Sequence, residues 1–319
     1  MSDTPDSFDR LIAPLGAQQF FEQYYDRRWL HQQGDTDRFA ELMSWDALNR
    51  ILSMNVWTQR TMEMNLDRQK LPPQAYCEPA MDRNHQQVLR PSKARVMDLV
   101  RRGASLVLNE VETLHPPIRG IVGAIESALG ARASANVYCS WQHHQAFDSH
   151  FDRHDVFALQ VLGEKRWNIY AGRAEHPIEH AMFHNVPQAT YDQMKGQVAK
   201  QVTMRPGDLI YLPRGQFHDA IATDAASIHV TFSATAPNGL DWLTQLWNEA
   251  VALPEFRAYL PRVEGSQDQE TMRLHLQGLL QKLSQAALSP EAVARITDMR
   301  RNYRMLPPAF DLPDGPGEG

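Results

Sequence analysis

The hydrophobic pattern of the chain changes its period near residue 135, and this change limits the folds open to it. From Ala135 to about Ser233, short apolar runs alternate with turn residues, which is typical of an all-β sandwich or barrel. On both sides of this stretch, apolar residues recur at helical spacing. The sequence therefore predicts an α+β, mainly β protein, in which a strand barrel lies between two helical regions.

The same change of pattern divides the chain into four parts. We expect a mixed region of helices and strands that packs on the barrel, the barrel with a polar, His-rich insertion, a helical region, and a flexible tail. Their predicted bounds are 1–134, 135–236 with the insertion at 172–199, 237–306, and 307–319.

Local signals predict individual elements within these parts. Aromatic residues at helical spacing indicate a helix over 18–30, and Ser44, Ser92 and Ser289 are candidate helix caps. Two prolines open a helix that runs from 116 to about 130. Gly163 and Glu164 separate two apolar runs, which predicts a tight hairpin between them.

Composition excludes several classes of protein. The 319 residues are 43% hydrophobic and 22% charged, as in ordinary globular proteins, and no apolar run reaches the length of a membrane span. The net charge of −6 argues against a general nucleic-acid binder. Two isolated cysteines, and an N-terminus without the features of a secretory signal, favour a cytoplasmic protein.

The strongest chemical signal is a His-x-Asp motif formed by His150 and Asp152. Residues i and i+2 of a strand share one face, so both side chains can reach one ion. His218 follows a Pro-Gly-Asp turn and an apolar strand, and it can complete a set of two histidines and one carboxylate. That set is diagnostic of non-haem Fe(II) oxygenases.

The segments HFDRHDVFALQVLGEKRWNIY, from His150, and PGDLIYLPRGQFH, ending at His218, resemble the JmjC and cupin-like oxygenases that use Fe(II) and 2-oxoglutarate. The chain is most similar to the branch that contains the ribosomal oxygenases, over residues 15–235. The resemblance implies a double-stranded β-helix, a helical dimerisation region after it, and a homodimer. It also implies that His150, Asp152 and His218 bind the metal.

By the same resemblance, Lys165 binds the distal carboxylate of 2-oxoglutarate. A lysine that begins an inward-facing strand needs an anionic partner, which agrees with this role. Asn136 and Tyr138 match a strand that lies beside the cosubstrate and the substrate, and either could contact them. The family's ordinary cupin relatives carry a histidine where this chain has Asp152, followed by a glutamate that it lacks.

Each of these residues also has a plain structural interpretation. His150 and Asp152 could form a hydrogen-bonded pair, and Lys165 could lie in water at a hairpin tip. We expect His154 to lie beside the metal site rather than to ligate. His229 could approach the site from the last barrel strand, but a hydrogen-bonded core residue is the favoured interpretation. His143 and His144 indicate a loop, and the spacing of His176, His180 and His184 is better explained by a solvated loop than by a metal site.

These observations predict an Fe(II) and 2-oxoglutarate dependent dioxygenase that hydroxylates a protein or peptide side chain and releases succinate and CO₂. One alternative is an oxygenase that acts on a small metabolite or on tRNA. Another is a catalytically silent cupin-type binding module.

Overall fold

The structure is a computed structural model that describes residues 7–141, 147–183, 186–223, 226–263, 265 and 268–305. The chain forms two compact units. The first consists of Met1–Ala128, Ala133–Thr235 and Met305–Gly319, and the second of Leu129–Arg132 and Ala236–Arg304.

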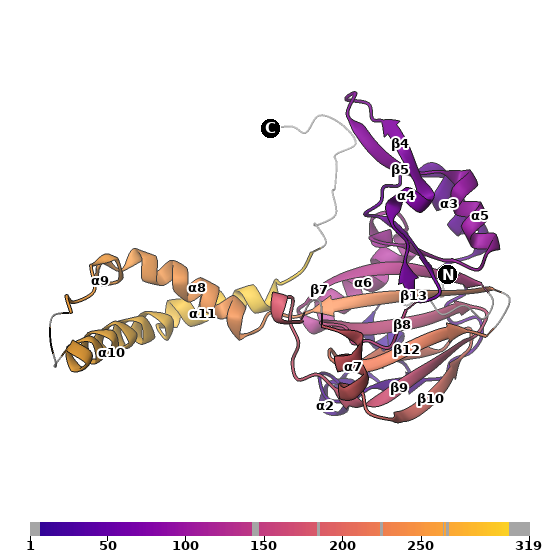
Figure 1. Cartoon of the computed structure of the whole chain (residues 1–319). Helices are drawn as coiled ribbons and strands as arrows, with labels where there is room; N and C mark the ends of the chain where they lie inside the picture. Colours follow the sequence, from indigo (N-terminus) through magenta and orange to yellow (C-terminus); the bar gives the residue numbers. More distant parts are fainter. Residues whose placement is uncertain are drawn as a thin grey trace, which may run out of the picture. The chain divides into compact units, whose positions relative to one another are not determined.

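Two antiparallel sheets form the centre of the first unit (Figure 1). The larger has eight strands, in the spatial order β1 (Leu30–Gln32), β11 (Leu209–Leu212), β8 (Asp155–Leu162), β13 (Ala226–Thr235), β7 (Arg132–Trp141), β6 (Ser105–Leu108), β2 (Met62–Leu66) and β3 (Gln69–Lys70). The smaller has three, in the order β10 (Val198–Met204), β9 (Lys165–Arg173) and β12 (Gln216–Ala222). This arrangement is a double-stranded β-helix, as predicted.

Apolar side chains from both sheets fill part of the space between them. The strands alternate, so every second residue points inward. The larger sheet contributes residues of β8 and β11, and the smaller sheet contributes residues of β9 and β10. Together they form one buried cluster: Val156, Ala158, Trp167, Ile169, Val202, Met204, Ile210 and Leu212.

The predicted hairpin at Gly163 and Glu164 is wrong. Strand β8 pairs with β11 and β13, whereas β9 pairs with β10 and β12, so the turn carries the chain from one sheet to the other. Gly163 has a φ of +64°, and a Cβ atom there would lie 2.1 Å from the carbonyl oxygen of Ala226. Glycine fits this crossing because it adopts positive φ without a steric penalty.

Helices and a small hairpin precede the barrel. The elements are α1 (Phe8–Leu11), α2 (Ala17–Gln23), α3 (Trp45–Met54), α4 (Pro73–Tyr76), β4 (Cys77–Met81), β5 (Gln87–Pro91), α5 (Lys93–Arg101), a 3₁₀ turn η1 (Val111–Thr113) and α6 (Pro116–Leu129). Figure 1 shows the β4–β5 hairpin beside α4 and α5.

Most local signals in this region are confirmed. Ser44 caps α3 by accepting a hydrogen bond from the Ala47 backbone, and α6 begins at the proline pair. Ser92 occupies the N-cap position of α5, but its side chain makes no capping hydrogen bond. The helix predicted over 18–30 ends early, because the chain turns at Asp26, whose φ is +50°.

The polar insertion at 172–199 is not a plain solvated loop. It contains the 3₁₀ turn η2 (Ala181–Phe183), helix α7 (Gln188–Met194) and the start of β10. Phe183 and Tyr191 pack, with Tyr170, against a buried cluster of Phe151, Ala174 and Phe217. The insertion therefore packs directly against the segment that carries the His-x-Asp motif.

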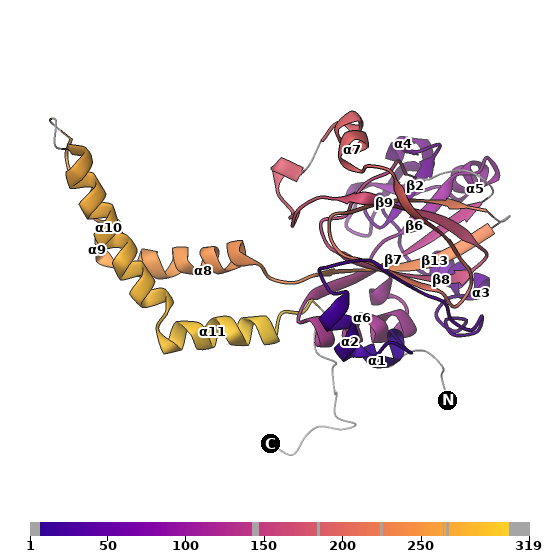
Figure 2. The same cartoon turned by 90° about the horizontal axis from the view of Figure 1, so that it is seen from below.

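The second unit is helical, as expected for 237–306. It contains α8 (Gly239–Ala252), α9 (Pro254–Arg257), α10 (Asp268–Ala287) and α11 (Pro290–Arg301), of which α8, α10 and α11 are prominent in Figure 2. Ser289 caps α11, as predicted. Among the described residues, no helix combines the length and the apolar character that crossing a membrane requires. The tail at 307–319 lies outside the described residues.

Candidate metal centre

A two-residue bridge between backbone segments brings the predicted metal ligands together. The His150 N–H donates to the His218 carbonyl at 3.0 Å, and the His218 N–H donates to the His150 carbonyl at 2.8 Å. Residues directly opposite each other on antiparallel strands point to one face. The centres of the two imidazole rings lie 4.6 Å apart.

Asp152 joins the two histidines on this face. One ligand atom from each of His150, Asp152 and His218 lies within 4.8 Å of the others. The segment is extended but lies before β8, which begins at Asp155, so the motif precedes a strand rather than starting one. Its i, i+2 geometry nevertheless holds, because the bridge to His218 keeps the backbone extended.

Backbone carbonyls orient both imidazole rings. Nδ1 of His150 lies 2.8 Å from the Asp148 carbonyl, and Nδ1 of His218 lies 2.9 Å from the Gln216 carbonyl. When Nδ1 is protonated and donates to a carbonyl, the lone pair of Nε2 is free to bind a metal. Metal-binding histidines are usually held in this way. Nε2 of His218 lies 3.6 Å from the Asp152 carboxylate.

The electrostatics of the site favour the forms that bind metal. Burial, reinforced by the charge of His150, lowers the pKa of His218 to about 4. Burial alone would raise the pKa of Asp152, but the neighbouring histidines, His154 first, hold it below the ordinary value. Neutral imidazole and anionic carboxylate are the ligand states that a divalent ion needs. The residues present therefore fit a ferrous ion.

The three residues line a cavity of about 550 Å³ between the two sheets. All six predicted site residues belong to its wall. The lining residues are Ser134, Asn136, Tyr138, Phe147, His150, Asp152, His154, Val156, Lys165, Trp167, His218, Ala220, His229, Thr231 and Ser233.

Lys165 points into this cavity as a buried amine. Only 4% of its surface is exposed, and burial lowers its pKa to about 7. The ion pairs of the described residues give it no carboxylate partner, and its Nζ atom lies 3.2 Å from Nδ1 of His229. A buried cation without a counter-ion is costly. The distal carboxylate of 2-oxoglutarate is an anion that would offset this cost.

Tyr138 and Asn136 share the face of β7 that lines the cavity. Their neighbours Ala135, Val137 and Cys139 are fully buried on the other face. The Tyr138 ring stacks on His229 with 4.8 Å between ring centres. Asn136 accepts a hydrogen bond from the Glu110 backbone at 3.4 Å.

His229 is a wall residue that our sequence analysis undervalued. It is buried and hydrogen-bonded, as expected of a core histidine, but its ring faces the cavity between Lys165 and Tyr138. Burial and the Lys165 charge hold the pKa of His229 well below its ordinary value. The alternation of side chains along β13 could have indicated this, because His229 shares one face of the strand with Thr231 and Ser233.

The remaining histidines are placed apart from the ligand set. His154 lines the cavity, and its Nε2 atom lies 3.9 Å from Asp152, which fits the predicted role beside the metal. His176 contacts Arg214 at 3.3 Å, and His180 accepts from the Met182 backbone at 3.2 Å. His143, His144 and His184 lie outside the described residues.

Comparisons with known proteins agree with this fold. The chain is a double-stranded β-helix whose cavity brings two histidines and one aspartate together. Residues 114–242 match the family model of the JmjC domain. The family resemblance drawn from the motifs is thus confirmed.

Curated relatives are similar to this chain in sequence. The chain is 29% identical over 266 residues to ribosomal oxygenase 1 of Gallus gallus, covering 80% of this chain and 42% of that protein. It is 26% identical over 266 residues to the bifunctional lysine-specific demethylase and histidyl-hydroxylase NO66 of Dictyostelium discoideum, covering 79% and 48%. The chain thus spans about half the length of these relatives.

The fold matches that of Escherichia coli YcfD. One YcfD structure aligns with a TM-score of 0.59 and 16% identity, covering 94% of this chain and 75% of the other. A YcfD structure in complex with cobalt and 2-oxoglutarate aligns with a TM-score of 0.56 and 16% identity, covering 94% and 74%. At this identity the match supports the fold.

We expect the wild-type chain to bind one Co(II) or Fe(II) ion, measured by anaerobic calorimetry. His218→Ala and Asp152→Ala should each weaken binding by more than about 100-fold, the upper range for loss of a mere supporting contact. His180→Ala, an exposed histidine outside the cavity wall, is the matched control and should bind as the wild type does. Tight binding by His218→Ala, or equal damage by His180→Ala, would contradict this ligand set.

Proposed function

We propose that the protein is an Fe(II) and 2-oxoglutarate dependent dioxygenase that hydroxylates a protein or peptide side chain. The observation that supports this most directly is the convergence of His150, Asp152 and His218 in a cavity whose wall also carries the buried Lys165. The donor set suits ferrous iron, and the lone ammonium suits a dicarboxylate.

The proposal gives a role to the metal ligands and to the residues around Lys165. His150, Asp152 and His218 hold Fe(II) on one face and leave its opposite face to other ligands. Lys165 binds the far carboxylate of 2-oxoglutarate, with His229 and Tyr138 fixing its position. Asn136 orients Tyr138. Bound Fe(II) and 2-oxoglutarate would supply the oxidising chemistry, which consumes dioxygen and releases succinate and CO₂.

The walls of the cavity add positioning and shielding. Trp167 stacks on His218 with 5.7 Å between ring centres, and Val156 belongs to the same apolar wall. These side chains keep water away from the reacting centre, which strengthens the electrostatic contacts inside it. Ser134 and Ser233, hydrogen-bonded at 2.8 Å, give another part of the wall a polar surface for substrate.

A protein substrate is favoured by the names of the relatives, ribosomal oxygenase and histidyl-hydroxylase. A small metabolite or tRNA remains the alternative substrate class. A silent binding module is the other alternative, and the complete set of ligands with Lys165 speaks against it. Anaerobic addition of Fe(II) and 2-oxoglutarate separates an oxygenase from a silent module, since an oxygenase should give a visible charge-transfer band.

The catalytic test is succinate production with ribosomal proteins and their peptides as candidate substrates. We expect the intact mass of the true substrate to increase by one oxygen atom, in step with the succinate formed. His150→Ala should abolish both signals while the circular dichroism of the barrel is retained. Full turnover by that variant would refute the proposed site.

The low pKa of Lys165 predicts how 2-oxoglutarate binding depends on pH. Above pH 7 the free amine is mostly neutral, so binding the carboxylate requires uptake of a proton, and affinity falls as pH rises. The groups that face Lys165 do not titrate near this range: the pKa of His229 lies far below it, and burial raises the pKa of Tyr138 and of Cys139 to about 12.

We expect the dissociation constant of 2-oxoglutarate to rise about tenfold per pH unit above pH 8, measured by calorimetry with Co(II) present. Lys165→Met should bind more weakly and show little change with pH. Lys200→Met, on an exposed position of β10, should behave as the wild type does. A wild-type affinity that is flat from pH 7 to 9 would remove Lys165 from the carboxylate site.

We also propose that the protein is a homodimer joined through its helical unit. In α8, the predicted apolar face is only partly covered: Leu246 is buried, but Leu243 is 49% exposed and Trp247 is 72% exposed. Large exposed apolar side chains on one element are typical of an interface. A cytoplasmic location is proposed with it, because Cys77 and Cys139 are both free thiols.

Sedimentation velocity should give twice the chain mass of 36.4 kDa. Trp247→Glu should shift the protein toward the monomer, because it places a charge in the interface, while Co(II) binding is unchanged. Gln245→Glu, on the same helix, is a charge control. A wild-type protein that sediments as a monomer at micromolar concentration would exclude the dimer.

A further inference from the structure

The residues next to the two histidine ligands point away from the metal site. In extended backbone, neighbouring side chains lie on opposite faces, so Ser149 and Asp219 face outward while His150 and His218 face the cavity. Both are nonetheless buried, each with 6% of its surface exposed. A buried carboxylate and a buried hydroxyl need partners.

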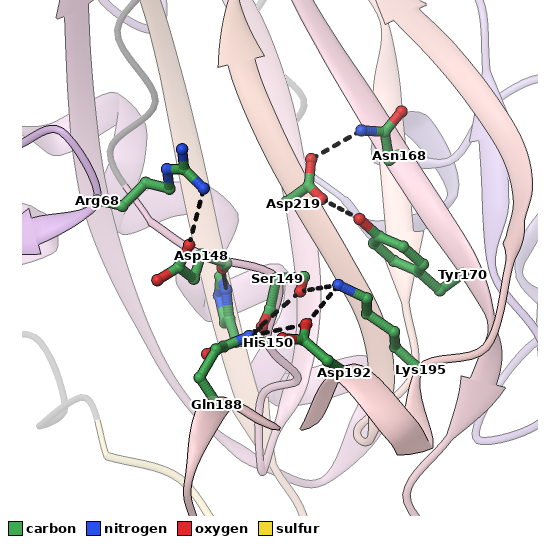
Figure 3. Close-up of polar contacts among 10 residues, drawn as sticks. All are labelled: Arg68, Asp148, Ser149, His150, Asn168, Tyr170, Gln188, Asp192, Lys195 and Asp219. Carbon is green, nitrogen blue, oxygen red and sulfur yellow. Dashed lines mark hydrogen bonds and ion pairs between the residues drawn. The ribbon is translucent and has the colours of Figure 1, made fainter. Parts of the chain in front are cut away.

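Asp219 is held by two side chains of β9. The Tyr170 hydroxyl donates to one carboxylate oxygen at 2.5 Å, and the Asn168 amide donates to the other at 2.8 Å (Figure 3). Hydrogen bonds to an ionised acceptor are the strong ones in proteins. They fix β12 to β9 immediately beside the ligand His218.

Ser149 is held from the insertion. Lys195 donates to the Ser149 hydroxyl at 2.9 Å and also pairs with Asp192, while the Gln188 amide donates to the Ser149 carbonyl at 3.0 Å (Figure 3). The two groups of contacts meet at Tyr170. Its ring lies 5.1 Å from Lys195 Nζ, and Lys195 in turn donates to the Ser149 hydroxyl.

The segment that carries Ser149, His150 and Asp152 depends on such contacts. It is not part of a regular strand. Among the described residues, its backbone is tied to β12 and the residue before β12 only by the His150–His218 pair and by the Gly215 N–H, which donates to the Asp152 carbonyl at 2.8 Å. A segment held by few ladder bonds keeps its position through side-chain contacts. The Arg68–Asp148 pair also touches this segment, but both side chains are largely exposed, and surface ion pairs contribute little.

We infer that Tyr170 and Lys195 are positioning residues for the metal centre. Together they tie the residue before His150 to the residue after His218, and so keep the Nε2 atoms of both rings directed at one ion. The inference rests on the proposed function, because it gives these residues a role only if the three ligands bind a metal. Neither residue lines the cavity or touches the metal, cosubstrate or substrate in this assignment.

The test compares tyrosines of one aromatic cluster. Tyr170→Phe removes the hydroxyl and keeps the ring. Tyr191→Phe is the matched control, since its ring packs on the same Phe151 and Phe217 but does not bridge Ser149 and Asp219. Co(II) alone is the probe, with calorimetry for affinity and visible absorption for the geometry of its ligands. We expect Tyr170→Phe to bind Co(II) about tenfold more weakly and with an altered spectrum.

A second pair of variants keeps the test decisive if Tyr170→Phe folds poorly. Lys195→Met should weaken Co(II) binding and alter the spectrum in the same direction, and Lys200→Met should do neither. Wild-type affinity and spectrum in both Tyr170→Phe and Lys195→Met would overturn the inference alone. Failure of the wild-type protein to bind Co(II) would overturn the proposed function itself.

Discussion

The pair of backbone hydrogen bonds between His150 and His218 is the constraint on which the site depends. Residues 68 positions apart in the chain become direct neighbours, and both imidazoles must then face the same side. Asp152 follows on that side because of the two-residue period of extended backbone. The metal geometry is therefore a consequence of strand pairing, while the carbonyls that hold each Nδ1 determine which nitrogen is free.

The site also requires polar side chains that can be buried in the barrel at a low cost in free energy. Lys165 and His229 are both buried beside each other, and burial moves both pKa values downward, toward the neutral forms. Neutral side chains are cheaper to bury than charged ones. An anion that enters the cavity reverses this preference at Lys165, because its charge favours the protonated amine. The protein can thus keep an empty cavity without a buried ion pair and still attract a dicarboxylate.

Strand parity explains which parts could be predicted from the sequence. The alternation in β7 puts Asn136 and Tyr138 on one face, the resemblance implies that this strand lies beside the cosubstrate, and the His-x-Asp spacing brings His150 and Asp152 together. Pairing between distant strands is not encoded in such local patterns. For this reason the predicted hairpin at Gly163 is wrong, since the turn crosses between sheets, and local pattern leaves open whether His229 belongs to the core or faces the cavity. Tyr170 belonged to a recognised motif, but its link to Asp219 needs the β9–β12 register.

The proposed metal ligands and Lys165 lie on only part of the cavity wall, so residues on the rest of the wall can be substituted without displacing them. The smaller sheet carries Lys165 and His218, and the extended segment before β8 carries His150 and Asp152, so the chemistry is concentrated there. Strands β7 and β13 contribute Ser134, Thr231 and Ser233, which lie in the same cavity outside the proposed ligand and carboxylate contacts. Substitutions on this wall can alter what fits beside the iron without displacing a ligand. Substrate preference can therefore change while the metal geometry, fixed by the His150–His218 pair, stays the same.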